Sequence, residues 1–377
     1  MIDKEIHVGV VGVGLKGTHH LRSIKSLIEE NLFKSSGKII INAIGDINEE
    51  KLQKVKEKFS VEHAYLDSFK MIEDGVIDAL WITTPTRFHK EYFLAATKKG
   101  IHVYCEKPLA FSLSDIDEMI NARDVNNIIA QVGLEARSLP LIPHLKKMVQ
   151  KKGKKFGRLQ NILFRDMQEK AYLDKPSHPS TWRKDKDMAY HGLLFEHMCH
   201  DLDGIVSIFG MPRSIYANIK YFAGYEDIED SVSVVMDLVN GATLTMQGTW
   251  NDVDKDGRRY EIYFENAYVE IAYDSFTKQN DEGEWISEST LDYKQIVNNK
   301  DVKLDGLVVM ADFLVELGLP SMQPLPLEPC RFANARFFKA IFDGTPAYPS
   351  LEDARRVQGL IEKCYESSRD GKVIQLG

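Results

Sequence analysis

The sequence predicts two domains: a doubly wound α/β domain over residues 1–136, and an α+β domain with an open, largely antiparallel sheet over residues 137–377. Short apolar runs alternate with helical patterns along the first part, which is typical of parallel βαβ units. After about Arg137 strands outnumber helices, and VSVVMDL and ATLTMQGTW alternate apolar and polar residues. A chain of 377 residues is also long for one hydrophobic core.

Charge and composition exclude several classes of protein. A formal net charge of −8 argues against general nucleic-acid binding, which usually needs a basic surface. No apolar run approaches the roughly 18 residues of a membrane span, and the N-terminus passes straight into the first strand without room for a signal peptide. The cysteines lack CxxC spacing and are expected to stay reduced. We therefore predict a cytoplasmic protein.

The run IHVGVVGVGLKG, from Ile6 to Gly17, reads as a strand, a glycine-rich turn and the start of a helix. Its G-x-G-x-x-G pattern permits a tight turn, close approach of the backbone to a pyrophosphate, and close packing of the helix whose N-terminal amides face the phosphates. This pattern predicts a dinucleotide-binding Rossmann domain. The candidate cofactor-binding residues here are Gly12, Gly14, Leu15, Lys16 and Gly17.

Asp46 follows the second predicted strand, Ile39–Ile44, where a carboxylate can accept hydrogen bonds from the adenosine ribose. The distance from Gly17 exceeds the usual ~20 residues. The extra length lies in the loop Asn31–Lys38. No arginine follows Asp46 directly, which favours NAD over NADP.

The rest of the first domain continues the alternation, and its strand C-termini are expected to face the binding crevice. Two of them carry candidate cofactor contacts, TTPTRFH with Thr84, Pro85 and His89, and EKP with Glu106 and Lys107. The predicted elements are helix 49–59, strand 78–83, helix 90–99, a strand ending at EKP, helix 115–123 capped by Ser112 or Ser114, and strand 128–134.

The second half has four predicted helices and a series of strands. The predicted strands are 159–165, 214–221, 231–238, 242–249, 259–265 and 268–272, and the helices are 144–150, 194–209, 332–343 and 351–368. Residues 281–301 are polar and are expected to be rich in loops.

The order of the glycine loop, Asp46, TTPTRFH, EKP and EHMCHDLD, with the closing YPSLEDARRVQGLIEKCYESSRDGKVIQL, resembles the Gfo/Idh/MocA oxidoreductases over nearly the whole chain. EKP is the most specific mark. The resemblance implies that Lys107 faces the substrate hydroxyl and the nicotinamide. Physically, an ammonium group at a strand C-terminus can stabilise a developing alkoxide during hydride transfer. The alternative is a surface lysine paired with Glu106.

In FEHMCHDLD, Glu196 and His200 are four residues apart and are expected to share a helix face, with Asp203 one turn beyond. Histidine titrates near neutrality, so His200 could take the hydroxyl proton. The family often has Asp-x-x-x-His here. Glu196 replaces that aspartate and could orient His200, touch a substrate hydroxyl or coordinate an ion. The alternative is a helix-surface pair.

The last candidate site residues lie in one loop and in one cluster of possible metal ligands. By resemblance, AYLDKPSHPSTWRKDKD lines the substrate pocket, although Trp182 could instead be a packing anchor. The predicted substrate-binding residues are Tyr172, Trp182, Arg183 and Asp203. His178 lies in the same loop, and the signals at Tyr216, Trp250 and Arg258 are weaker. Neighbours on a helix point in different directions, so we predict no metal from the cluster of His191, Glu196, His197, Cys199, His200 and Asp201.

Together these features predict an NAD-dependent dehydrogenase, with NADP less favoured, that acts on a CH–OH group of a sugar, sugar derivative or cyclic polyol. Lys107, His200 and Glu196 are its candidate catalytic residues. One alternative keeps the cofactor but uses transient sugar oxidation for elimination or glycoside cleavage. Another is a nucleotide-sensing regulator, which the presence of Lys107 and His200 disfavours. An open sheet face predicts a homodimer or homotetramer.

Overall fold

The computed structural model describes residues 4–138, 141–151, 156–169, 181–252, 257–279, 285–298, 300–302 and 329–377. The chain forms two compact units. Residues 1–135 and 329–356 belong to the first, and residues 136–328 and 357–377 belong to the second. The sequence predicts a single boundary after residue 136, whereas residues 329–356 of the structure also belong to the first unit.

The first unit is built on a six-stranded parallel sheet with strand order β3-β2-β1-β4-β5-β6. This is the order of a Rossmann domain, and β1 and β4 flank its switch point. The strands are β1 (Glu5–Val11), β2 (Lys38–Gly45), β3 (His63–Tyr65), β4 (Ala79–Ile82), β5 (His102–Cys105) and β6 (Ala130–Val132). The helices are α1 (Leu15–Glu29), α2 (Glu49–Phe59), α3 (Ser68–Glu73), α4 (His89–Lys98), α5 (Leu113–Val125) and α12 (Pro329–Asp343).

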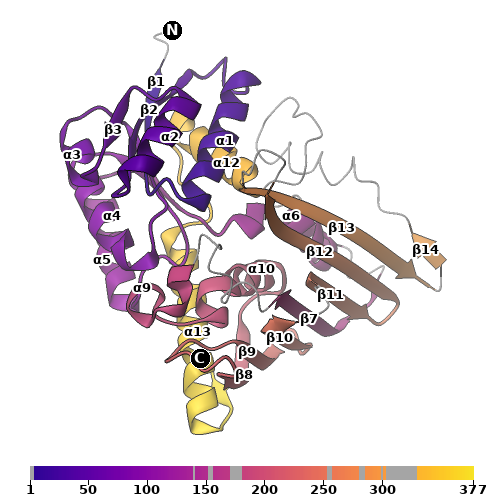
Figure 1. The fold of residues 1–377 in the computed structure, drawn as a ribbon. Helices are drawn as coiled ribbons and strands as arrows, with labels where there is room; N and C mark the ends of the chain where they lie inside the picture. The colour runs from indigo at the N-terminus through magenta and orange to yellow at the C-terminus, as the bar shows by residue number, and fades with distance from the viewer. Residues whose placement is uncertain are drawn as a thin grey trace. The chain divides into compact units, whose positions relative to one another are not determined.

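Helices pack on both faces of this sheet, as the doubly wound prediction requires. Side chains of α3, α4 and α5 share one core with Leu80, Ile82 and Val103 of the strands. The opposite face carries Trp81, whose ring lies 5.2 Å from that of Phe338 in α12. Helices α1 and α12 pack against each other on this side, although they are far apart in sequence (Figure 1).

The second unit is built on a sheet with strand order β14-β13-β12-β11-β7-β10-β9-β8-β15. Neighbouring strands are antiparallel except β7 and β10, which are parallel. The strands are β7 (Leu159–Glu169), β8 (Pro212–Lys220), β9 (Ser231–Leu238), β10 (Thr243–Asp252), β11 (Gly257–Phe264), β12 (Ala267–Gln279), β13 (Trp285–Val297), β14 (Lys300–Val302) and β15 (Ile374–Gln375). The prediction of an open, largely antiparallel sheet is confirmed.

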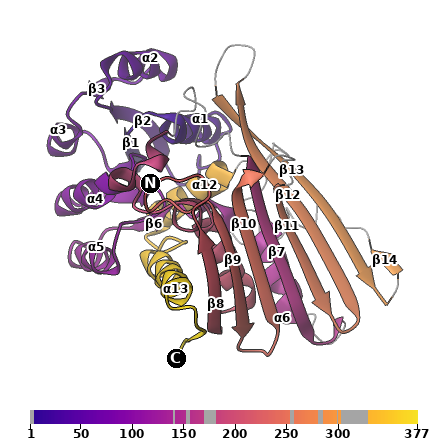
Figure 2. The same ribbon diagram turned by 60° about the horizontal axis from the view of Figure 1, so that its bottom comes forward.

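One face of this sheet carries the core of the second unit. Ile162 and Val234 of the sheet pack with residues of α6 (Leu141–Lys151) and α10 (Cys199–Phe209), and Figure 2 shows the strands as one broad layer. Helix α13 (Leu351–Asp370) adds residues from Val357 onward to the same core. Along β9, buried and exposed residues alternate, so the other face carries the exposed side chains.

The expectation of loops over residues 281–301 is wrong. Strand β13 pairs with β12 along its whole length, from Trp285 opposite Gln279 to Val297 opposite Ala267. A long antiparallel hairpin satisfies backbone hydrogen bonds whatever the polarity of its side chains, so polar composition misled the prediction. Among the described residues no helix is both long and apolar enough to cross a membrane. No disulfide joins the four cysteines, which are all buried.

Candidate active site

The glycine loop joins β1 to α1 by a tight turn. Gly12 has φ of +84°, a conformation that favours glycine, and a Cβ there would lie 3.0 Å from the backbone of Thr83. A Cβ on Gly17 would lie 2.2 Å from the carbonyl oxygen of Gly12. These two glycines therefore allow α1 to start close against the end of the strand.

The space beside Gly14 is the candidate pyrophosphate site. No heavy atom lies within 4 Å of the position that a Cβ would take there. Gly14 also caps α1 without a side-chain hydrogen bond, and the first turn of the helix, which includes Leu15 and Lys16, contains no acidic residue. The positive end of the helix dipole thus faces a cradle with room for a phosphate, which fits NAD.

Asp46 lies one residue beyond β2 and is bonded to the glycine loop. Its Oδ2 accepts a hydrogen bond from the Val13 N–H at 2.9 Å, and its Oδ1 accepts one from the Asn48 N–H at 2.9 Å. The carboxylate is therefore fixed beside the candidate pyrophosphate site. A fixed negative charge here suits a ribose hydroxyl and disfavours a 2′-phosphate.

We expect Asp46→Ala to weaken NADH binding about tenfold and to narrow the difference between NADH and NADPH, because ribose loses its acceptor and a 2′-phosphate loses a repulsive charge. Fluorescence titration of both cofactors measures the two dissociation constants. Glu62→Gln, which alters a carboxylate that is 74% exposed in the same unit, is the control. An unchanged ratio of the two constants would contradict the assignment.

Thr84, Pro85 and His89 follow β4. The ring of His89 lies between two loops, with Nδ1 2.8 Å from the Pro108 carbonyl oxygen and Nε2 2.9 Å from the Thr84 carbonyl oxygen. Burial lowers the pKa of His89. Its side chain therefore braces the loop after β4 against the loop after β5, and any effect on a cofactor passes through the backbone of Thr84 and Pro85.

Glu106 and Lys107 follow β5 directly, and both are buried, with exposed fractions of 4% and 8%. Burial alone would raise the pKa of the Glu106 carboxyl, but Lys16, His20 and Lys107 together lower it to about 2. Glu106 is therefore a carboxylate among cations. Lys107 is not a surface lysine, which removes the alternative interpretation of the EKP motif.

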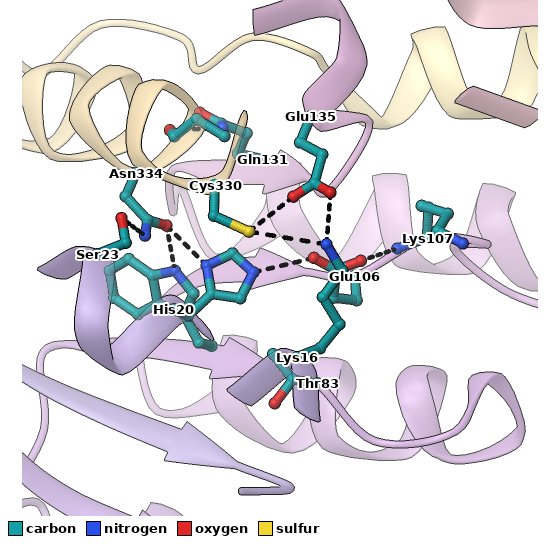
Figure 3. A network of polar contacts seen from close by, with 12 residues as sticks. Lys16, His20, Ser23, Thr83, Glu106, Lys107, Gln131, Glu135, Cys330 and Asn334 are labelled. Carbon is teal, nitrogen blue, oxygen red and sulfur yellow. Dashed lines mark hydrogen bonds and ion pairs between the residues drawn. The ribbon is translucent and has the colours of Figure 1, made fainter. Parts of the chain in front are cut away.

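Lys16 reaches from the glycine loop into the same group of charges (Figure 3). Its ammonium pairs with Glu135 and lies 3.7 Å from the Cys330 sulfur, while the Cys330 thiol donates to Glu135 at 2.9 Å. Burial opposes the charge, but Cys330, Glu135 and Glu106 together raise the pKa of Lys16 well above its usual value. The structure thus places Lys16 beside Glu106, a contact that sequence spacing did not predict.

In the second unit, the predicted helix over residues 194–209 is not continuous. A π-helical turn, η4 (Leu193–His197), precedes α10, and the Met198 N–H donates to the Leu193 carbonyl oxygen. Glu196 lies in the π turn and His200 lies in α10, so regular α-helical geometry does not describe the segment that joins them. A shared helix face for the two residues stays a prediction.

Glu229 fixes the start of the π turn by hydrogen bonds, a role that the sequence did not predict. Its carboxylate accepts hydrogen bonds from the N–H groups of Gly192 at 2.7 Å and Leu194 at 2.8 Å, and from the Tyr365 hydroxyl at 2.8 Å. Burial raises the pKa of Glu229 to about 7. Nothing local in the sequence marks this contact, because Glu229 is more than 30 positions from the turn.

Glu196 and Arg183, predicted separately, form one buried pair. The Arg183 Nε lies 3.4 Å from the Glu196 Oε2, and Glu196 is fully buried. The Arg183 guanidinium also lies 4.5 Å from the ring centroid of Trp182. His200 is 9% exposed in α10. Tyr172 and His178 lie outside the described residues.

Asp203 forms an ion pair with Arg137, which the sequence did not mark as a site residue. The Arg137 guanidinium makes a two-pronged ion pair with Asp203, with Nε at 2.6 Å from Oδ2, and the two side chains are 4% and 0% exposed. A substrate-binding role for Asp203 therefore conflicts with its burial and partner. The available signal was an aspartate among apolar residues of a helix, which requires a buried partner.

The other residues of the possible metal cluster each contact a different partner. The ring of His191 lies 4.4 Å from that of Tyr365, while the Nε2 of His197 lies 3.1 Å from the Asp166 Oδ2. Asp201 accepts from the Arg258 Nε at 2.7 Å. Of the weaker substrate candidates, Trp250 is 1% exposed and Tyr216 lies on the exposed face of the sheet at 42%.

Asp201 and Asp166 form a buried carboxyl pair beside Arg258. Burial and the neighbouring Asp166 raise the pKa of Asp201 to about 8, while Arg258 and His197 lower that of Asp166. Two buried carboxylates side by side repel each other, so one of them keeps a proton. Asp201 is that residue, because burial and the neighbouring Asp166 raise its pKa.

We expect Asp201→Asn to gain stability relative to the wild type as the pH rises. Folded Asp201 keeps a proton that the unfolded chain loses near pH 4, so this group stabilises the fold at low pH and the contribution is lost on the way to about pH 8. An amide reproduces the protonated form. The difference in unfolding free energy should grow by about 1.4 kcal/mol per pH unit. Urea unfolding at pH 5.5 and 7.5 measures it, and a pH-independent difference would contradict it.

Comparison with known proteins agrees with this arrangement. The family model described as "Oxidoreductase family, NAD-binding Rossmann fold" matches residues 6–134, and the "GFO/IDH/MocA C-terminal domain" matches residues 144–270. The two matches together cover more than half of the chain. The chain belongs to the Gfo/Idh/MocA family. Its first unit is accordingly the NAD-binding domain of an oxidoreductase of this family.

Two curated Gfo/Idh/MocA relatives act on polyols or sugars by name. Myo-inositol 2-dehydrogenase of Thermotoga maritima is 36% identical over 35% of this chain and 37% of its own length. Levoglucosan dehydrogenase of Pseudarthrobacter phenanthrenivorans is 24% identical over 70% of this chain and 71% of its own length. A solved levoglucosan dehydrogenase in complex with NADH and levoglucosan has the same fold, with a TM-score of 0.80, 21% identity and 99% of each chain covered.

Proposed function

We propose that the protein is an NAD-dependent dehydrogenase that transfers hydride between nicotinamide and a hydroxyl-bearing carbon of a sugar, sugar derivative or cyclic polyol. The observation that carries the proposal is the buried Lys107 directly after β5, in the same unit as the open cradle at Gly14. The inositol and levoglucosan dehydrogenases among the relatives support this substrate class.

In this proposal NAD supplies the hydride acceptor, and the protein supplies binding, charge stabilisation and proton transfer. Lys107 holds the substrate oxygen and stabilises the negative charge that develops on it. His200 takes the hydroxyl proton. Arg183, whose side chain is 11% exposed and pairs with the fully buried Glu196, offers a donor for a further hydroxyl of the substrate.

The test is a panel of inositols, levoglucosan and hexoses with NAD and the purified protein. At least one compound should yield NADH, followed by its absorbance, and should do so faster with NAD than with NADP. Absence of both NAD binding and NADH formation across the panel would contradict the proposal. Substrate consumption without net NADH would instead support transient oxidation coupled to elimination or cleavage, and a chelator arm reports any metal requirement.

We further propose that a second copy of the chain covers the exposed face of the sheet in the second unit. Leu163, Thr245, Val235 and Tyr216 stand opposite one another in successive strands β7, β10, β9 and β8. Leu163, Val235 and Tyr216 are 37%, 42% and 42% exposed, which makes an apolar row across the face.

The cytoplasmic location expected from the sequence stays a prediction.

We expect the wild type to scatter light as a dimer or tetramer, and Val235→Lys to shift it towards the monomer, because a lysine in the row would have to be desolvated. Lys363→Glu, at a 46% exposed position on α13, is the control. A monomeric wild type would contradict this assembly.

A further inference from the structure

His20 lies on α1 and is fully buried, yet both of its ring nitrogens have polar partners (Figure 3). The Nδ1 lies 2.9 Å from the Asn334 Oδ1, and the Nε2 lies 2.9 Å from the Glu106 Oε1. A neutral imidazole donates from one nitrogen and accepts at the other. Which nitrogens of His20 donate therefore depends on what Asn334 and Glu106 can offer.

The orientation of the Asn334 amide is fixed by its other contacts. The Trp81 Nε1 donates to the Asn334 Oδ1 at 2.9 Å, and the Asn334 Nδ2 donates to the Ser23 Oγ at 2.9 Å. An indole N–H can only donate, so the atom that faces it must be the amide oxygen. The same oxygen faces His20. The Nδ1 of His20 must therefore carry a proton.

Glu106 sets the state of the second nitrogen. Burial raises the pKa of the Glu106 carboxyl, but the ammonium groups of Lys16 and Lys107 lower it, so the group is a carboxylate at neutral pH. A carboxylate can only accept. The Nε2 of His20 must then carry a proton as well. Tyr104, which packs its ring edge-on at 4.8 Å, brings no charge at neutral pH because burial and the nearby acids raise its pKa.

We infer that His20 is a buried imidazolium and that it acts as a positioning residue for Lys107, by fixing the carboxylate of Glu106. The second oxygen of that carboxylate, Oε2, accepts the backbone N–H of Lys107 at 3.3 Å. Gly133 packs against its other side, since a Cβ there would lie 2.8 Å from the Glu106 Cδ. The carboxylate is thus held between α1 and the peptide that carries Lys107.

The same charges disfavour the binding of a metal ion at a cluster of ligand-type side chains in the first unit. His20, Glu135 and Cys330 bring ligand-type atoms within 4.8 Å of one another. A protonated nitrogen cannot bind a metal ion. The ammonium of Lys16 already lies against both Glu135 and Cys330. The group is a charge network that ends at His20 rather than a cation site.

The protonation state can be measured without reference to any activity. The full-length protein is labelled with ¹⁵N-histidine, and long-range ¹H–¹⁵N correlations are recorded at pH 7.5, with His20 assigned by its loss in His20→Gln. Both nitrogens of His20 should show shifts of the protonated type. One nitrogen of the unprotonated type at pH 7.5 would overturn the inference, whether or not the proposed dehydrogenase function holds.

The positioning role rests on the proposed function and is tested by kinetics. His20→Met, which cannot donate, should lower kcat about tenfold with KM for NAD within about twofold, because misplacing a catalytic group costs rate rather than cofactor affinity. His20→Gln keeps a donor for Glu106 and should recover most of the loss.

Two outcomes would overturn the positioning role: His20→Met with wild-type kcat, or equal losses of kcat in His20→Met and His20→Gln. Thermal unfolding of both variants separates a general loss of folding from the expected effect. If no compound in the panel is oxidised by the wild type, the proposed function fails while the NMR result still decides the state of His20.

Discussion

Lys107→Met is expected to lower kcat by about 10²–10³-fold, the usual cost of removing one group that stabilises charge in the transition state. The side chain keeps its length and apolar stem, so the fold and the cradle at Gly14 should remain. Binding of NADH should therefore change little. The measurements are steady-state rates with a substrate found in the panel, and NADH affinity by fluorescence titration.

A matched control for this substitution is Lys90→Met. Lys90 lies in the same unit, pairs with Asp115 and Glu118, and is 32% exposed. It should keep wild-type rates. Full activity in Lys107→Met would contradict the assigned role, and an equal loss in Lys90→Met would point to a general effect of removing positive charge from this unit.

Asp203→Leu is expected to destabilise the second unit by about 3–5 kcal/mol, because it leaves the Arg137 guanidinium buried without its partner. The pair is 4% and 0% exposed and bidentate, so water cannot replace the lost carboxylate. Arg137→Met should cost a similar amount. The double variant Arg137→Met/Asp203→Leu should recover much of the loss, since no charge then remains buried.

Urea unfolding of the four proteins gives these free energies and the coupling between the two sites. Arg158→Met is the control in the same unit, because its ion pair with Glu265 is exposed and should contribute no more than about 1 kcal/mol. A loss below about 1 kcal/mol in Asp203→Leu would contradict the structural role and would return Asp203 to the candidates for substrate binding.

The parts of the site that the sequence predicted are those in which local spacing determines geometry. Gly12, Gly14 and Gly17 follow one strand, and Asp46 and Lys107 each follow another. In a parallel sheet the ends of neighbouring strands lie at one edge, so knowing the strands is enough to bring such residues together. Periodicity and glycine spacing contain this information, which is why the fold class could be predicted as well.

The contacts that were missed join positions far apart in the sequence. Asn334 meets His20 across 314 positions, and Arg137 meets Asp203 across 66. Burial is a property of the folded chain, so one sequence shows that an aspartate in an apolar helix needs a partner but not which arginine supplies it. The π turn was missed for a different reason, since its residues continue the apolar pattern of the following helix.

The return of residues 329–356 to the first unit bears on how the protein is made. On the ribosome, the nucleotide-binding half is not complete when its sixth strand emerges, because Trp81 and Tyr104 pack against Phe337 of α12. That apolar surface becomes covered, and the Asn334 amide that orients His20 becomes available, only after the chain up to residue 328 has been synthesised. A fragment that stops after residue 136 would expose this surface, so a chimera that exchanges substrate units should carry residues 329–356 with the nucleotide-binding half.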